Sequence, residues 1–275
     1  MTNGIRTAAL MAAMIVLFAL VGQALGGQTG MVIALLFALG TNFASYWFSD
    51  KIVLKMYKAS EVTRAQAPEL FDMVDRLRQN ANLPMPKVYV IPSDQPNAFA
   101  TGRNPNNAAV AVTNGIVRLL NRDELEGVIA HELAHIKNRD ILTSSISAVM
   151  ASAITMIAQF GFFFGGNDDE GPGIVGTLMM LILAPIAASL IQMAISRSRE
   201  YAADRDGATI ARNPMGLAGA LRKIEAYAQG VPMQQAREAS AHMFIVNPFA
   251  GERVSRLFAT HPPTQERIAR LQQMR

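Results

Sequence analysis

The chain of 275 residues contains no cysteine. Disulfide bonds are therefore excluded, and so are metal sites built from thiolates. Histidine is also scarce, with four residues in the whole chain. Any site for a transition metal must combine some of these imidazoles with carboxylates.

Charged residues are the next shortage, at 17% against about 25% in a typical globular domain. Hydrophobic residues make up 51% of the chain and are concentrated in long blocks. Each block is long enough to cross a bilayer core of about 30 Å as a helix. The sequence predicts an integral membrane protein with four transmembrane helices, at about 5–24, 31–49, 141–165 and 174–196. A cleaved signal peptide is the alternative for the first block, but its apolar stretch is longer than a typical signal core.

Basic residues are missing from two of the connections between these blocks. The 25 Lys and Arg lie at Arg6, within 51–140 or within 197–275, whereas the connection at 166–173 reads GNDDEGPG. Since Lys and Arg accumulate in cytoplasmic loops, we expect both termini and both polar segments to be cytoplasmic. These membrane-flanking residues also explain the net charge of +4, so no nucleic-acid partner is expected. The predicted order is a transmembrane hairpin, a cytoplasmic α/β part, a second hairpin and a cytoplasmic helical part, at 1–50, 51–140, 141–196 and 197–275.

The first polar segment has the pattern of a small α/β unit. Residues 67–83 have the apolar periodicity of a helix, and a further helix is predicted to begin at Asn121 or Asp123. Short strands are predicted at 87–91, 97–101 and 108–113. Residues 197–275 read as helical. The predicted fold is mainly α, with one small β-sheet.

The second of these helices contains the sequence HELAH, residues 131–135. Residues four apart lie on the same face of a helix, so His131 and His135 can bind one metal ion. Glu132, about 100° round the helix, can reach a water on that ion and accept its proton. This pattern is typical of zinc metalloproteases. A surface helix with two solvated histidines is the alternative.

A zinc site of this kind needs a third protein ligand. His242 and His261 are candidates, but Glu200 is better placed. As helices, residues 135–165 and 174–200 would each measure about 40–45 Å, so a hairpin of the two returns Glu200 to the level of His135. Asp204 lies four residues further on and is predicted to accept a hydrogen bond from a ligand imidazole.

The motifs HELAH, RSREYAAD, NAFATG and THPPTQERI, together with four apolar blocks in this order, resemble the HtpX family of membrane zinc metalloproteases. These are relatives of the CAAX prenyl proteases, and the resemblance covers essentially the whole chain. It implies a cytoplasmic, zincin-like protease domain with one zinc ion held by His131, His135 and Glu200, and Glu132 as the catalytic base. It also implies an edge strand that receives the substrate backbone, at Asn97, Ala98, Phe99 and Ala100.

The resemblance further implies a role and a location. The family performs quality control and stress response in the bacterial inner membrane, where it cleaves misfolded or damaged membrane proteins at the cytoplasmic side. We therefore expect polypeptide substrates, mostly membrane proteins, and a multi-pass chain in contact with the lipid bilayer.

Several assignments have competing interpretations. From its residues alone, the NAFAT segment could instead be an ordinary core strand, and His261 either caps a turn or donates to the developing oxyanion.

The activity could instead be cleavage within the membrane, but the HELAH helix is flanked by charged residues and so begins in water. A non-proteolytic zinc-dependent scaffold, chaperone or transporter is the rival of another class. A scaffold has no need of Glu132, and a transporter usually has ionisable groups within its spans.

Overall fold

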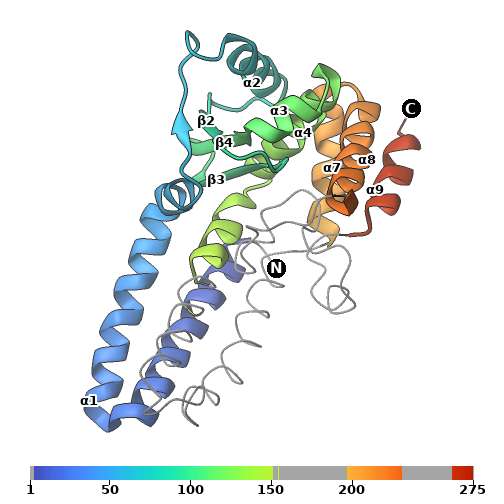
Figure 1. The fold of residues 1–275 in the computed structure, drawn as a ribbon. Coiled ribbons are helices and arrows are strands. Elements are labelled where there is room, and N and C mark those ends of the chain that lie inside the picture. Colours follow the sequence, from blue (N-terminus) through green and yellow to red (C-terminus); the bar gives the residue numbers. More distant parts are fainter. Residues whose placement is uncertain (1–2, 151–153, 155–196, 231–261, 275) are drawn as a thin grey trace.

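The structure is a computed structural model that describes residues 3–150, 154, 197–230 and 262–274. In Figure 1, a long helical hairpin leads up to a small sheet, and the helices of residues 197–230 lie beside the helix of residues 122–137. The described helices are α1 (Asn3–Met56), α2 (Pro68–Asn80), α3 (Asn114–Leu119), α4 (Arg122–Lys137), α7 (Arg197–Ala211), α8 (Pro214–Gly230) and α9 (Thr264–Gln272).

The hairpin is formed by α1 alone (Figure 1). Gly27 has a positive φ of 58°, a backbone conformation that glycine adopts without steric cost. The two arms touch at Gly22, where an added Cβ would lie 2.5 Å from the Cβ of Ala34. Further along, the rings of Phe18 and Phe37 lie 5.5 Å apart. The sequence predicted a hairpin of two helices joined by a connecting segment, whereas α1 stays helical through the bend.

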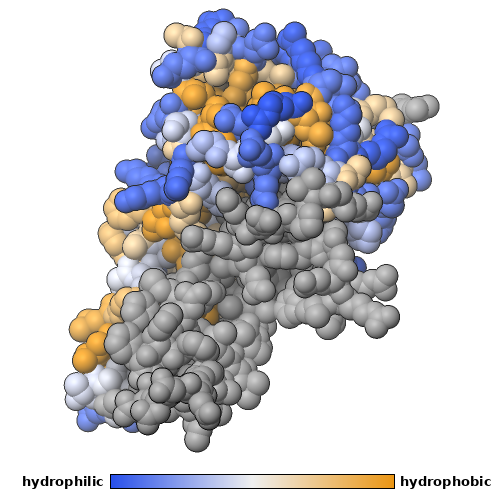
Figure 2. All heavy atoms as spheres, in the orientation of Figure 1, coloured by the Kyte–Doolittle hydropathy of each residue, from blue (hydrophilic) through white to orange (hydrophobic). Residues whose placement is uncertain are grey.

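Among the described residues, one helix is long and apolar enough to cross a membrane, Gly27–Met56. Thr7–Gln23 and Ile141–Met150 are shorter apolar helices. The predicted block at 174–196 and most of the block at 141–165 lie outside the described residues. Four transmembrane helices therefore stay a prediction. In Figure 2, hydrophobic residues face outward along α1 at the lower left.

The sheet has four strands in the order β1-β2-β4-β3. The strands are β1 (Ser60–Glu61), β2 (Lys87–Ile91), β3 (Ala98–Asn104) and β4 (Asn107–Thr113). β2 and β4 are parallel, while β1–β2 and β3–β4 are antiparallel. The three predicted strands are confirmed, although β3 extends three residues further than expected. β3 lies at one edge of the sheet, as the resemblance implied for this segment.

The helix that carries HELAH begins with a capping box. The side chain of Asn121 accepts a hydrogen bond from the backbone of Glu124, and the Glu124 carboxylate accepts one from the backbone of Asn121. Of the two starts predicted for this helix, Asn121 is therefore the capping residue and Asp123 is not. Most of α4 is buried, because α7 and α8 both pack against it.

Two glycines permit this close packing of helices. A Cβ added to Gly207 of α7 would lie 2.9 Å from the backbone N and Cα of His131. One added to Gly127 of α4 would lie 2.4 Å from the backbone N of Leu217 in α8. Real Cβ atoms do not approach backbone so closely, so α4 reaches this depth between α7 and α8 only with glycine at both positions.

β3 is also joined to the helical segment Ile141–Met150. The hydroxyls of Thr101 and Ser145 lie 2.8 Å apart in a buried hydrogen bond. A second buried hydrogen bond, between the hydroxyls of Thr7 and Thr143, joins this segment to the first arm of α1 at 3.0 Å. The sheet edge is thereby fixed directly above the apolar helices.

Candidate metal centre

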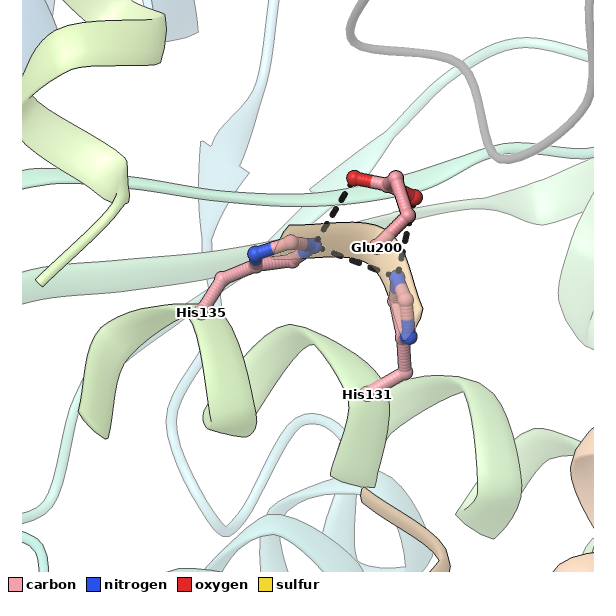
Figure 3. A group of neighbouring side chains, drawn as sticks. All are labelled: His131, His135 and Glu200. Atoms are coloured by element: carbon pink, nitrogen blue, oxygen red, sulfur yellow. Dashed lines mark hydrogen bonds and ion pairs between the residues drawn. The ribbon is translucent and has the colours of Figure 1, made fainter. Parts of the chain in front are cut away.

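Two helices bring the three candidate ligands together (Figure 3). α4 carries His131 and His135 one turn apart, and Glu200 projects from the first turn of α7. Nε2 of His135 lies 3.2 Å from Nε2 of His131 and 3.5 Å from Oε1 of Glu200. Nε2 of His131 lies 3.8 Å from Oε2 of Glu200. Two imidazoles and one carboxylate therefore surround one point.

These spacings suit a single metal ion. Two atoms bound to zinc at about 2.0–2.2 Å and at a tetrahedral angle lie about 3.3–3.6 Å apart. The separations of 3.2, 3.5 and 3.8 Å bracket this range. Two imidazoles and one carboxylate, with a fourth position left for water, are also a donor set that catalytic zinc sites use. His131, His135 and Glu200 could thus hold a metal ion.

The second nitrogen of each imidazole lies next to a carboxylate. Nδ1 of His131 is 3.0 Å from Oδ1 of Asp204, and Nδ1 of His135 is 3.2 Å from Oδ2 of Asp140. A carboxylate in this position favours the tautomer with its proton on Nδ1, so that Nε2 is available to a metal. Asp204 was predicted for this position, and Asp140 was not.

Asp140 reaches His135 because of the turn that ends α4. Arg139 adopts the left-handed conformation, with a φ of 58°, and the Asp140 N–H donates to the carbonyl of His135 at 3.0 Å. Burial alone would lower the pKa of His135. The hydrogen bond to Asp140 and the charges of Glu200 and Glu132 outweigh burial and raise that pKa to about 9.

A buried arginine from the last helix completes the cluster. Arg267 of α9 is 1% exposed and forms two hydrogen bonds to Asp204, from Nε at 2.8 Å and from Nη2 at 2.6 Å. Its Nη1 lies 3.8 Å from Oε2 of Glu200. Burial would raise the pKa of Asp204, but the charge and hydrogen bonds of Arg267 hold it well below its usual range. Arg267 therefore keeps Asp204 ionised beside His131.

Glu132 faces the sheet edge. It is 6% exposed, and its Oε2 accepts a hydrogen bond of 2.8 Å from the backbone N–H of Ala100 in β3. This N–H points away from β4, to the free side of the edge strand. Because backbone groups alternate along an antiparallel strand, the N–H and C=O of Ala98 are expected to face the same side. The carboxylate next to the candidate ligands and the edge strand β3 are thus in direct contact.

The structure brings together most of the residues predicted for the site. Asn97, Phe99 and the other residues of the NAFAT segment lie in or beside β3, and Asn97 accepts a hydrogen bond from the Thr113 N–H through its carbonyl. His242 and His261 lie outside the described residues. The prediction missed Asp140, which stands five residues after His135. It also missed Arg267, although THPPTQERI contains it.

Comparison with known proteins identifies the family. Residues 64–275 match Peptidase family M48, and this range includes every residue of the candidate metal centre. The chain belongs to peptidase family M48. It is a metallopeptidase, and its His-His-Glu cluster is the group that could hold the metal.

Curated relatives of this M48 peptidase are similar over its full length. A "Protease HtpX homolog" of Salinibacter ruber is 65% identical over 274 residues, which cover 99% of this chain and 98% of that protein. One from Desulfatibacillum aliphaticivorans is 58% identical and covers 98% of this chain and 89% of that protein. One from Methylibium petroleiphilum is 59% identical and covers 100% of this chain and 98% of that protein. The resemblance to HtpX proteases is confirmed.

A solved structure, the crystal structure of S. mikatae Ste24p, is similar at 18% sequence identity with a TM-score of 0.49. The match covers 98% of this chain and 64% of that one.

Proposed function

We propose that this metallopeptidase is a membrane-bound, zinc-dependent endopeptidase that hydrolyses misfolded or damaged membrane proteins at the cytoplasmic face of the bacterial inner membrane. The observation that carries the proposal is the joint placement of three groups: the His-His-Glu cluster, the Glu132 carboxylate beside it, and the edge strand β3, whose Ala100 N–H binds that carboxylate.

One zinc ion per chain would be held by His131, His135 and Glu200. Zinc supplies a Lewis acid that polarises a peptide carbonyl and lowers the pKa of a bound water. Asp204 and Asp140 hold the two imidazoles in the tautomer that such an ion requires. Arg267 holds Asp204 in turn.

Glu132 is the proposed general base. It accepts a proton from the attacking water and delivers it to the nitrogen of the leaving peptide. The Ala100 N–H fixes one oxygen of this carboxylate at 2.8 Å, which leaves the other oxygen for the water. His261 is proposed to donate to the developing oxyanion.

The edge of β3 is the proposed site for the substrate backbone. An extended peptide can add to a free strand through backbone hydrogen bonds. Folded domains present few extended segments of this kind, so the geometry favours unfolded or damaged proteins.

The proposed orientation follows from the basic residues. Both segments that carry the cluster, 51–140 and 197–275, are rich in Lys and Arg, which favours the cytoplasmic side. The acidic connection at 166–173 would face outward. Membrane-protein substrates are proposed because β3, which contacts Glu132, also packs against α1.

The test is cleavage of an unfolded model protein and of a membrane protein with an extended cytoplasmic tail. We expect hydrolysis with zinc, loss of it with a chelator, and cut sites outside the hydrophobic span. Glu132→Gln should reduce the rate by about 10²–10⁴-fold. Binding of the unfolded protein without hydrolysis would favour the scaffold or chaperone, and cut sites inside the span would favour the intramembrane protease.

A further inference from the structure

Aromatic residues gather where α1 approaches β3. Four of them expose a large part of their surface, between 37% and 61%: Phe43, Tyr46, Trp47 and Phe48. Their rings contact one another, with centroids 6.3 Å apart for Phe43 and Trp47 and 5.4 Å apart for Tyr46 and Trp47. They lie in the second half of the apolar helix Gly27–Met56. Exposed Trp and Tyr in such a position are typical of the boundary between hydrocarbon and lipid headgroups.

Two basic side chains cover this aromatic group. The guanidinium of Arg103, which belongs to β3, lies 4.6 Å from the centre of the Trp47 ring. The amine of Lys51 lies 5.7 Å from the centre of the Phe48 ring. Within the described part of the chain, neither forms an ion pair with a carboxylate. The surface therefore has two positive charges with no acidic partner there, directly next to exposed aromatic rings.

We propose that this aromatic–basic surface, formed by Phe43, Tyr46, Trp47, Phe48, Lys51 and Arg103, binds the phosphate groups of anionic phospholipids in the membrane. The guanidinium fork of arginine matches a phosphate, and basic side chains at this depth are attracted to an anionic leaflet. The aromatic rings would lie at the level of the headgroups and the rest of the helix below them. This inference rests on α1 crossing the membrane, which is part of the proposed function.

The consequence for the active centre is a fixed distance from the proposed headgroup contact. Arg103 is three residues from Ala100 along β3, a distance of about 10 Å in a strand. Ala100 contacts Glu132. The same strand thus touches the headgroups at Arg103 and the proposed base at Ala100, so peptide bonds would be cut within about 10 Å of the proposed headgroup contact. Preferred substrates would be extended segments within a few residues of a transmembrane helix.

Trp47 is the only tryptophan in the chain, so it reports on this surface without labelling. The full-length protein would be placed in phosphatidylcholine vesicles whose lipids carry bromine either near the headgroup or near the end of the acyl chain. We expect the shallow bromines to quench Trp47 fluorescence more strongly than the deep ones. Equal quenching at both depths, or none, would overturn the proposed position of the surface.

A second series would add increasing fractions of phosphatidylglycerol and follow the emission of Trp47 in each variant against its own value in phosphatidylcholine. We expect Arg103→Gln to raise the fraction needed for half the response by about fivefold, and Lys51→Gln to behave similarly. Arg64→Gln is the matched control, because Arg64 is an exposed arginine paired with Asp72. It should respond like the parent.

A response of Arg103→Gln and Lys51→Gln equal to that of the control would contradict recognition of anionic headgroups. Zinc content and cleavage of a soluble unfolded protein would be measured on the same preparations. If these are intact while Trp47 is not at the headgroups, the inference fails and the proposed function stands. If zinc binding or cleavage is absent in the parent, the proposed function itself fails.

Discussion

At the scale of single residues, the cluster depends on the two nitrogen atoms of each imidazole, which have different neighbours. One nitrogen of His131 and of His135 faces the shared position, and the other faces a carboxylate. The candidate ligands could be predicted because helical periodicity fixes the spacing of two histidines four residues apart. Asp140 depends on a left-handed turn at Arg139, which periodicity does not reveal.

Substitution of Arg267 tests whether this arginine orients Asp204 towards His131. Arg267→Met should lower the affinity for zinc about 10–100-fold, because Asp204 loses the partner that keeps it ionised and oriented towards His131. It should also destabilise the protein by about 3–5 kcal/mol, since a buried carboxylate is left without its counter-ion. Zinc titration and thermal unfolding of the metal-free protein would measure the two effects.

Arg267→Lys is the matched control, because it keeps the charge and loses the fork of N–H donors. We expect it to recover much of the stability but little of the zinc affinity. If Arg267→Met binds zinc like the parent, Arg267 serves only the packing of α9.

Metal binding should depend on pH through His135. In the metal-free protein its pKa is raised to about 9, so it holds a proton at neutral pH that a metal must displace. Zinc affinity should therefore rise about tenfold per pH unit as the pH approaches that value, as measured by competition with a chromogenic chelator at about pH 6.5 and about pH 8. Affinity that does not change over this range would contradict a protonated His135.

The raised pKa has a second consequence, with a definite sign. Because the pKa of His135 is higher in the folded state than its ordinary value of 6.5, the contribution of this residue to stability is complete below pH 6.5. The metal-free protein should lose this contribution as the pH rises towards about 9. Zinc-bound protein should not, since the metal takes the place of the proton.

At the scale of elements, the site depends on how closely α7 packs against α4. Gly207→Ala would place a methyl group 2.9 Å from the backbone of His131, so the helices must separate. Overpacking of this kind costs about 1–3 kcal/mol, and it would move Glu200 away from the two histidines. We expect weaker zinc binding together with a lower melting temperature.

Gly40→Ala is the control, since a Cβ at Gly40 has nothing within 4 Å. It should leave zinc binding unchanged. If Gly207→Ala also leaves it unchanged, the spacing of α4 and α7 does not set the ligand geometry.

Some helices and strands could be predicted from the sequence better than others. β2 matches its prediction at both ends because KVYVI is rich in Val, Ile and Tyr and is bounded by Pro86 and Pro92. Asn121 was one of the two predicted starts of α4. β1 has only two residues and pairs with β2, and α3 has only six residues. Segments so short have no periodicity to detect, so their formation depends on tertiary contacts. Arg267 was missed for another reason: Ile268 and Leu271 mark the buried face of α9, but nothing local indicates that Asp204 lies opposite that face.

At the scale of the whole molecule, the proposed topology makes a prediction. With four transmembrane helices, a reporter fused after Arg275 should be active in the cytoplasm, and a tag in the connection at 166–173 should be accessible only from outside. Protease protection of membrane vesicles would compare both positions, with a tag after Asn80 as a cytoplasmic control. If the tag at 166–173 shows the same protection as the tags after Asn80 and Arg275, the third and fourth apolar blocks do not both cross the membrane.

The central claim is that Glu200 binds the metal while the neighbouring Glu132 performs the chemistry. The most direct measurement is the zinc content of full-length parent, Glu200→Ala and Glu132→Gln proteins, purified side by side and assayed for cleavage, with exposed Glu69→Gln as a control. We predict that Glu132→Gln keeps its zinc and loses activity by about 10²–10⁴-fold, whereas Glu200→Ala loses both. Zinc in Glu200→Ala equal to that of the parent, with loss of zinc in His261→Ala, would contradict the claim and replace the carboxylate with an imidazole.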